Sequence, residues 1–417
     1  MSSVLSDLPS EDVGQPAGAE PPRDPPGSLT RRSFLHRSGL VAGTVLVVAA
    51  GGLSYRAYDR GVFETGEGGA YDAWDTWEHG AGSLALVSAA VLAANPHNSQ
   101  AWVFRAGPSS IDVFADRARS TGSVDPFSRE MEVGLGAALE NLMQAAPAHG
   151  FRATLAVLPT PADPVHAARV DLAPGPRRRS ALYEAIPRRH TDRSPYGAKA
   201  VPPAVLARMT ALAGDLANTR VSWFTSEADR SRIGGLMVAA AQAITRDEQQ
   251  SRDSFRLFRA SWDDIQKYKD GLTLDTQGLS EMTTAIAKLL PPSTRSAGDT
   301  FWVDKTRDTQ TRTAAAYGVV AVPDSRDGAQ RITGGRLLER IHLWAAANGI
   351  ALQHMNQITE RADRERQLGL PPRFTRASRS LVPEAGWEQL VAFRVGYAQS
   401  DAGQRKSPRR PATAVTA

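Results

Sequence analysis

The sequence predicts an α+β fold in which a single chain holds two duplicated halves. The first observation is an internal repeat: residues 136–150 (GAALENLMQAAPAHG) match residues 335–349 (GRLLERIHLWAAANG) without a gap, 199 positions further on. Repeats on this scale indicate a duplicated structural unit. The second is that apolar residues recur at three- and four-residue intervals in both copies, and each copy ends in glycine, as amphipathic helices do. The third is a strand-like run on either side of each copy.

The elements of the first half follow from local patterns. An apolar stretch from Leu84 to Leu92 predicts a helix, and strands are expected at 102–104 and 111–114. Asp125 and Pro126 suit the N-cap and first position of the repeat helix. Alternating apolar residues at 154–158 predict the strand that follows it.

The second half repeats this pattern. A helix is expected to open at 201–203, strands at 319–322 and 350–352 flank the second repeat helix, and a last strand is expected at 390–397. Each half is therefore predicted as strand, helix and strand around a shared sheet.

The front of the chain differs in composition from the rest. Residues 1–29 are rich in Pro, Ser, Gly and acidic residues, which predicts a disordered tail. Residues 30–53 have the form of a twin-arginine export signal, with Arg31-Arg32, then Phe34-Leu35, then a short apolar run diluted by four glycines. The alternative is a buried apolar helix after a chance pair of arginines. If the signal is not cleaved, it would tether the protein to the membrane.

Residues 54–80 carry many aromatic side chains among glycines and acids. A flexible linker would leave these rings exposed, so the segment is predicted to wrap onto the folded part. The expected organisation is a tail (1–29), a signal (30–53) and a wrapping segment (54–80). The first half (81–178), the second half (179–385) and a last strand with a basic C-terminal arm (386–417) follow.

The bulk composition excludes several classes of function. With 41% hydrophobic and 22% charged residues the chain is an ordinary globular protein. The net charge is +5, and the basic residues gather at both chain ends and in one central run, not along one face of a helix. No nucleic-acid partner is therefore expected. Cysteine is absent, which excludes disulfides and thiolate sites, and no two of the eight histidines have the spacing of a helical metal pair.

A central run, residues 188–193, brings three arginines and a threonine hydroxyl together. The guanidinium fork fits phosphate oxygens, and a hydroxyl can bond a sugar-like oxygen, so an anionic ligand is the functional interpretation. The alternative is a solvated basic turn.

Two further polar clusters allow a binding interpretation and a structural one. Residues 97–100 (HNSQ) offer amide and hydroxyl groups that suit a heterocycle edge, or they form a polar turn before the strand at 102. Residues 406–410 (KSPRR) form a second basic element or a disordered basic tail.

Four motifs that follow one another along the chain resemble those of the Acg-type FMN-binding branch of the nitroreductase family. The resemblance runs from about residue 55 onward. The motifs are residues 95–102 (NPHNSQAW), 125–130 (DPFSRE), 189–193 (RHTDR) and 407–411 (SPRRP). The resemblance implies a nitroreductase-like fold in which the two halves are a homodimer fused into one polypeptide, a pseudo-dimer that works as a monomer. It also implies FMN held between the halves by His97, Asn98, Ser99, Gln100, Arg189, Thr191, Arg193, Arg409 and Arg410.

The chain departs from the family pattern at three places. Thr191 stands where serine is usual, which keeps the hydroxyl. The loop at 94–96 is one residue shorter than usual, and Ala101 replaces a proline before Trp102. The last two changes alter the loop beside the expected flavin.

The resemblance implies an exported FMN-dependent oxidoreductase that passes a hydride from NAD(P)H through the flavin to quinones or nitroaromatics. The alternative is a non-catalytic FMN-binding or sequestering protein, in which residues 252–292 cover the flavin as a closed lid. No side chain is assigned acid–base catalysis, and Glu130, Glu140 and Glu339 are expected in salt bridges or on solvated faces.

Overall fold

The computed structural model describes residues 57, 61–382, 384–400 and 405–417. The expected tail and the expected twin-arginine signal lie outside these residues and stay predictions. Among the residues that are described, no helix is both long and apolar enough to cross a bilayer.

The first half is built on a four-stranded antiparallel sheet with the order β1-β2-β4-β3. Its strands are β1 (Trp102–Ala106), β2 (Ser110–Ala115), β3 (Phe151–Val157) and β4 (His166–Pro174). The chain leaves β2, passes through the helix α5 (Arg129–Ala148) and returns in β3. β3 alternates between partly exposed and exposed residues, so one face of this sheet is open to solvent.

The second half repeats this topology. Its sheet has the order β5-β8-β10-β9, and all its strand pairs are antiparallel. The strands are β5 (Arg220–Phe224), β8 (Ala316–Val322), β9 (Ala351–His354) and β10 (Glu388–Gly396), with α13 (Gly328–Ala347) between β8 and β9. The α+β prediction and the placing of the two repeat helices are therefore confirmed.

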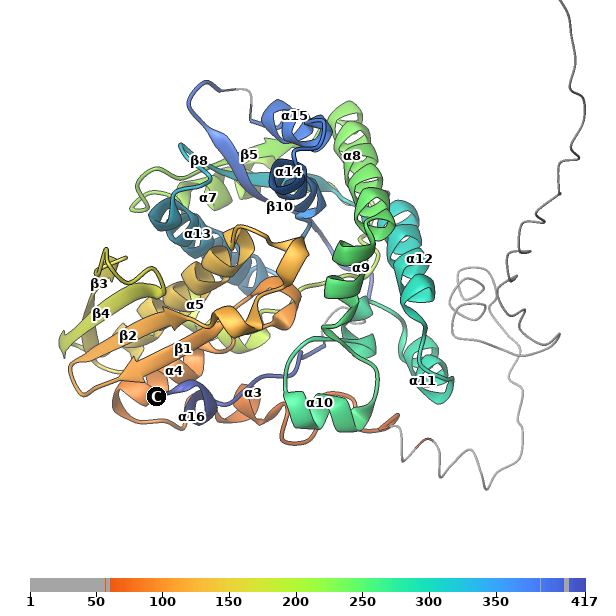
Figure 1. The fold of residues 1–417 in the computed structure, drawn as a ribbon. Coiled ribbons are helices and arrows are strands. Elements are labelled where there is room, and N and C mark those ends of the chain that lie inside the picture. The colour runs from red at the N-terminus through yellow and green to blue at the C-terminus, as the bar shows by residue number, and fades with distance from the viewer. Residues whose placement is uncertain (1–56, 58–60, 383, 401–404) are drawn as a thin grey trace, which may run out of the picture.

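The repeat helices α5 and α13 cross in the middle of the molecule (Figure 1). A Cβ atom on Gly136 would lie 2.0 Å from the carbonyl oxygen of Ile332, and one on Gly335 would lie 2.2 Å from that of Val133. These contacts are counterparts, because Gly136 and Gly335 differ by the same 199 positions as Val133 and Ile332. Glycine is required here because two helix backbones touch.

The predicted start of the first repeat helix is wrong by a few residues. The helix α5 begins at Arg129, and Ser128 before it has a left-handed backbone with φ of 58°. That conformation separates Asp125 and Pro126 from the helix. The Asp125 carboxylate still accepts a hydrogen bond from the Met131 amide at 2.9 Å, so it stabilises the first turn from a distance.

The core has three parts. One lies between the first sheet and α5 together with α4 (Gly82–Ala90), and a second lies between the second sheet and α13. A third covers the opposite face of the second sheet with α8 (Glu227–Arg246), α14 (Gln357–Leu368) and α15 (Arg373–Ser380). Every residue of β8 is buried, as expected for a strand covered on both faces.

The remaining elements lie around this frame (Figure 1). A short parallel pair joins β6 (Phe258–Arg259) to β7 (Leu272–Thr273). The other helices are α3 (Asp72–Thr76), α6 (Ala181–Ala185), α7 (Pro203–Ala211), α9 (Glu248–Phe255), α10 (Trp262–Tyr268), α11 (Glu281–Leu289), α12 (Arg295–Lys305) and α16 (Ala412–Val415).

The described part of the aromatic segment packs onto the folded domain. Tyr71, Trp74 and Trp77 are buried, although Phe63 is 76% exposed. The indole of Trp74 donates a hydrogen bond to the Ser407 carbonyl oxygen at 2.8 Å. The segment and the C-terminal arm therefore hold each other in place.

Candidate functional site

A cavity of about 250 Å³ lies where the two halves meet. The first half contributes the turn 95–97 and the start of α5, and the second half contributes Thr191, Arg193, the end of β9 and the start of α14. Residues between Ser254 and Trp302 complete the wall. This volume is near the lower end of the range for small-molecule sites, roughly 300–1,000 Å³.

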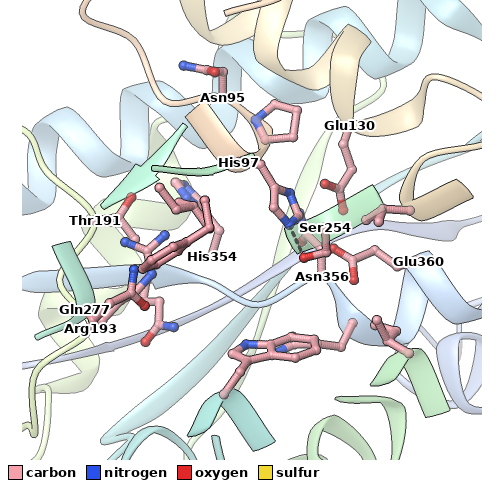
Figure 2. A pocket seen from close by; sticks show the side chains of 18 of the residues that line it. Asn95, His97, Glu130, Thr191, Arg193, Ser254, Gln277, His354, Asn356 and Glu360 are labelled. Atoms are coloured by element: carbon pink, nitrogen blue, oxygen red, sulfur yellow. Dashed lines mark hydrogen bonds between the residues drawn. The ribbon is translucent and has the colours of Figure 1, made fainter. Parts of the chain in front are cut away.

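One end of the cavity is cationic. Thr191, Arg193 and Gln277 lie together at this end, with His354 beside them (Figure 2). The Arg193 guanidinium donates a hydrogen bond from Nη1 to the Thr276 carbonyl oxygen at 3.1 Å. Burial lowers the pKa of Arg193 to about 10, so it remains charged at neutral pH. Burial, with the charges of Arg189 and Arg193, lowers the pKa of His354 to about 3, which keeps this imidazole neutral.

His97 enters the cavity from the loop before β1. Its backbone is left-handed, with φ of 48°, and its Nε2 lies 3.0 Å from the Ser254 hydroxyl (Figure 2). Burial and the nearby charge of Arg193 lower the pKa of His97 to about 4. His97 is therefore a neutral hydrogen-bonding group that joins the first half to the wall at Ser254.

The other end of the cavity is acidic. Glu130 at the start of α5 and Glu360 in the first turn of α14 lie there with Asn356 (Figure 2). Burial raises the pKa of Glu360 to about 7. Burial and the neighbouring carboxyl groups raise the pKa of Glu130 well above its ordinary value. The cavity thus has a permanent cation at one end and proton-holding carboxyl groups at the other.

Apolar side chains line the space between these ends. Leu272, Leu274 and two rings, Phe255 and Phe258, come from the segment expected to act as a cover, residues 252–292. Further aromatic surface comes from Phe301 and Trp302 of α12. Such a lining suits a flat, largely apolar ligand with polar groups at its ends.

The structure separates the predicted site residues into two groups. His97, Thr191 and Arg193 line the cavity, whereas Asn98, Ser99, Gln100, Arg189, Arg409 and Arg410 do not. Their assignment to a flavin stays a prediction.

The amides of Asn98 and Gln100 tie chain segments together behind the cavity. Asn98 donates from Nδ2 to the carbonyl oxygens of Gly271 at 3.1 Å and Pro408 at 2.8 Å. Gln100 donates from Nε2 to the Lys269 carbonyl oxygen at 2.8 Å and accepts from the Arg410 amide at 2.8 Å. The buried Ser99 hydroxyl has no hydrogen-bond partner among the residues described.

Arg189 and Arg409 are buried behind the residues that line the cavity. The Nε of Arg189 lies 3.2 Å from the Glu339 carboxylate, and its Nη2 donates to the Leu92 carbonyl oxygen at 3.0 Å. Arg409 donates to the Asn98 side-chain oxygen and to the Ser407 hydroxyl. Within the described part of the chain, the Nε atoms of both arginines lack a hydrogen-bond acceptor. Arg410 is partly exposed and donates to the Ala414 carbonyl oxygen at 2.9 Å.

Comparison with known proteins points to nitroreductases. The chain is 31% identical over 163 residues to a Mycobacterium tuberculosis protein provisionally named NAD(P)H nitroreductase Rv3131, which is 39% of this chain and 42% of that protein. It is 35% identical over 116 residues to the provisionally named NAD(P)H nitroreductase acg of the same species, which is 26% of this chain and 34% of that protein. The matched regions therefore span less than half the length of these relatives. No protein-family profile matches the chain.

Solved structures of nitroreductases match more weakly. The FMN-dependent nitroreductase NfnB of Mycobacterium smegmatis in complex with NADPH gives a TM-score of 0.36 at 17% identity, covering 57% of this chain and 97% of that one. A nitroreductase with bound FMN from Desulfitobacterium hafniense gives 0.33 at 15% identity, covering 56% of this chain and 95% of that one. Scores below 0.5 do not by themselves establish a common fold.

Sequence patterns did not indicate the acidic end of the cavity. Glu140 and Glu339 form salt bridges, as expected, but Glu130 is buried beside Glu360 and not solvated or paired with a cation. Glu360 and Gln277 lie in stretches that carry no motif. In the part of the chain that the structure describes, no three His, Asp or Glu side chains are arranged to hold a metal ion.

Proposed function

We propose that this protein binds FMN in the cavity between its halves and acts as a nitroreductase-like oxidoreductase. The observation that carries the proposal is the polarity of the cavity: a partly buried arginine with a hydroxyl and an amide at one end, and apolar and aromatic walls beyond it. A flavin mononucleotide has the matching shape, with a phosphate at one end and a flat ring at the other.

The charges around the cationic end fit a phosphate. Arg189 and Arg409 are buried and Arg193 is partly buried, and in the described structure neither Arg193 nor Arg409 forms an ion pair with a carboxylate. Glu339 is the carboxylate whose charge acts on both Arg189 and Arg409. Buried cations in excess of buried anions favour an anionic ligand, because an unpaired buried charge is strongly unfavourable.

The other contacts fit the remainder of the cofactor. Thr191 and Gln277 would hold ribityl oxygens, and the aromatic and aliphatic walls would enclose the ring. The bound flavin would supply hydride transfer, while the chain's own residues bind it, orient it and exclude water. We further propose that the two halves correspond to the subunits of a nitroreductase homodimer, which the repeated topology and the glycine crossing support.

A specific observation favours a second candidate, a protein that holds FMN without turnover. The wall over the cavity is fastened to the first half at several points. These are His97 to Ser254, Asn98 to Gly271, Gln100 to Lys269, and Arg119 to Asp270. A cover held this firmly would exclude a nicotinamide donor.

The visible absorption spectrum of the purified protein tests the proposal. A yellow protein that releases FMN on heating is expected, and Arg193→Gln should weaken FMN binding by at least tenfold, since a charge-assisted hydrogen bond contributes roughly 1.5–3 kcal/mol. Arg208→Gln, a change at an exposed arginine of α7, serves as the control and should bind FMN normally. A colourless protein that fails to take up added FMN would refute the assignment.

Anaerobic mixing with NADPH separates the two candidates. Bleaching of the oxidised flavin within seconds supports the oxidoreductase. If NADPH has no effect while dithionite still reduces the flavin, the sequestering function is the correct one.

We also propose that residues 30–53 direct export through the twin-arginine pathway, with or without retention at the membrane. The paired arginines and the short, glycine-diluted apolar run support this. Arg31→Lys together with Arg32→Lys should leave the protein inside the cell. Unchanged localisation on cell fractionation would count against the proposal.

A further inference from the structure

The acidic end of the cavity contains a carboxyl pair that the proposed flavin site does not use. Glu130 belongs to the first half and Glu360 to the second, and both line the cavity. The two carboxyl groups lie close enough to act on each other, because the charge of Glu360 and a hydrogen bond with it add to the burial that raises the pKa of Glu130. Two neighbouring carboxyl groups in a buried site favour holding a proton, because like charges at short range disfavour ionising both.

The residues around Glu130 and Glu360 supply little positive charge to these two carboxyl groups. The charged groups that act on them from the neighbouring elements are Asp125, before α5, and Asp363 of α14. The nearby cation, Arg129, is engaged by Asp363 at 2.7 and 2.8 Å and by the Gln389 carbonyl oxygen. Asn356 also hydrogen-bonds Glu130. One oxygen of Glu130 is buried with no hydrogen-bond partner among the described residues.

The two carboxyl groups differ in how deeply they are buried. Glu130 is 6% exposed and its pKa is raised well above its ordinary value. Glu360 is partly exposed and its pKa is raised to about 7, so Glu360 is the group that exchanges a proton near neutral pH. A group whose pKa lies near the working pH is well suited to proton transfer. Loss of the Glu360 proton is made easier because the Glu130 hydroxyl can stabilise the resulting carboxylate.

We propose that Glu360 is the proton donor to an uncharged oxygen-bearing ligand that is reduced in this cavity, and that Glu130 is its positioning residue. This inference rests on the proposed function, since a reduced flavin is the hydride donor. It adds a protein-borne proton source to the site.

The step balances in atoms and charge. A quinone that becomes a hydroquinone takes up two electrons and two protons. The hydride brings both electrons and one proton. The Glu360 O–H bond breaks as the second O–H bond of the product forms, which leaves a Glu360 carboxylate that accepts the Glu130 hydroxyl. Solvent then returns the proton to Glu360, and the pair passes from neutral to a single negative charge and back.

Infrared spectroscopy of the flavin-free protein tests the protonation state directly. Glu339, with a pKa raised to about 7, will also contribute a carboxylic-acid band, so the readout is the difference between wild type and each variant. The wild type should show carboxylic-acid absorption at pH 6 that Glu360→Gln lacks, and Glu339→Gln should retain the Glu360 contribution. Identical spectra of wild type and Glu360→Gln at pH 6 would overturn the inference.

Reoxidation of the reduced, flavin-loaded protein by a benzoquinone tests the catalytic role. In the wild type the rate should fall as pH rises through about 7 and should show a solvent isotope effect. Glu360→Gln should slow this half-reaction by roughly 10²–10⁴-fold and remove both dependences, the range for a positioned general acid. FMN affinity and the rate of reduction by NADPH should not change. Glu248→Gln, at an exposed glutamate of α9, is the control.

The outcomes distinguish the two proposals. If the wild type fails to bind FMN, the proposed function and the donor role fail together. If the wild type binds FMN but Glu360→Gln is reoxidised at the wild-type rate, the donor role alone is wrong. Glu130→Gln should lower the reoxidation rate less than Glu360→Gln does, because the glutamine amide remains a hydrogen-bond donor beside Glu360. A larger loss in Glu130→Gln, with correct folding, would reverse the assigned roles.

Discussion

Glu140 and Glu339 occupy equivalent positions in the two central helices, but their partners differ. Glu140 accepts hydrogen bonds from Arg336 at 3.1 Å and Arg340 at 2.8 Å. Glu339 lies 3.2 Å from Arg189 and accepts from the Ala94 amide at 3.3 Å. Burial outweighs these contacts and raises the pKa of Glu339 to about 7. Glu339 therefore changes its charge near neutral pH.

Arg189→Met should destabilise the protein because it leaves the Glu339 carboxylate buried without a cation. We expect a loss of about 3–5 kcal/mol in the free energy of unfolding at pH 8. The loss should be smaller at pH 6, where Glu339 can take up a proton instead. Urea unfolding at both pH values measures this, and adding Glu339→Gln should recover part of the loss. An equal loss at both pH values would contradict the explanation.

The ionisation of Glu339 also predicts how stability depends on pH. Its pKa is raised from 4.5 to about 7 in the folded protein, so the protonated form stabilises the fold below pH 4.5 and this contribution is lost as pH rises to about 7. Compared with Glu339→Gln, the wild type should lose roughly 3 kcal/mol over this interval. Parallel stability curves for the two proteins would mean that Glu339 ionises normally.

At the level of elements, the turn before β1 holds several residues in the left-handed backbone region beside the cavity. His97, Asn98 and Gln100 have φ values of 48°, 53° and 52°, a region that L-residues seldom occupy. Hydrogen bonds donated by the Asn98 and Gln100 side chains to the carbonyl oxygens of Gly271, Lys269 and Pro408 hold it. The motif residues here stabilise a loop geometry that presents His97 to the cavity.

The glycine crossing gives a prediction about the central helices. Gly136→Ala and Gly335→Ala should each destabilise the protein by at least about 3 kcal/mol, because the new methyl group meets a backbone carbonyl that cannot turn aside. The double variant should lose less than the sum, since one separation of the helices relieves both clashes. Thermal or chemical unfolding measures these effects.

Gly235 offers a matched control for this pair. It lies within α8, and a Cβ atom there would meet nothing within 4 Å. Gly235→Ala should therefore stabilise the protein by roughly 0.5–1 kcal/mol. If Gly136→Ala behaved like Gly235→Ala, the close crossing of α5 and α13 would be wrong.

The regular elements were predictable from sequence, and the cavity was predictable only in part. Repeat spacing and alternation identified α5, α13 and their flanking strands, because both signals depend on local burial. The start of α5 was missed because Ser128 adopts a left-handed backbone that no nearby residue indicates. Glu130 and Glu360 were missed because their pairing joins residues far apart in the sequence, and a lone glutamate on a helix looks the same whether solvated or buried.

For the whole molecule, the two halves share a topology, but the counterparts of several cavity residues have different neighbours in the part of the chain that the structure describes. Shifting the cavity residues Val133, Gly134 and Ala137 by 199 positions gives Ile332, Thr333 and Arg336. In this counterpart region Arg336 is bound to Glu140, and Arg340 bridges Glu140 and Asp215. Salt bridges thus occupy the counterpart of this part of the cavity wall.

We therefore expect one FMN per chain. The ratio of flavin absorbance to protein concentration in the saturated protein measures this directly, with FMN quantified after heat release. A ratio near two would mean that the salt bridges around Glu140 open to admit a second cofactor.

The meeting of α5 and α13 within a single polypeptide has a consequence for how the site could change over time. In a pair of identical chains, every substitution appears twice, so a residue that improves one site also alters the other. Here Glu130 lines the cavity while its counterpart, 199 positions on, is Ala329. Covalent linkage lets equivalent positions of the two halves carry different residues, so a substitution at the cavity is not repeated at its counterpart.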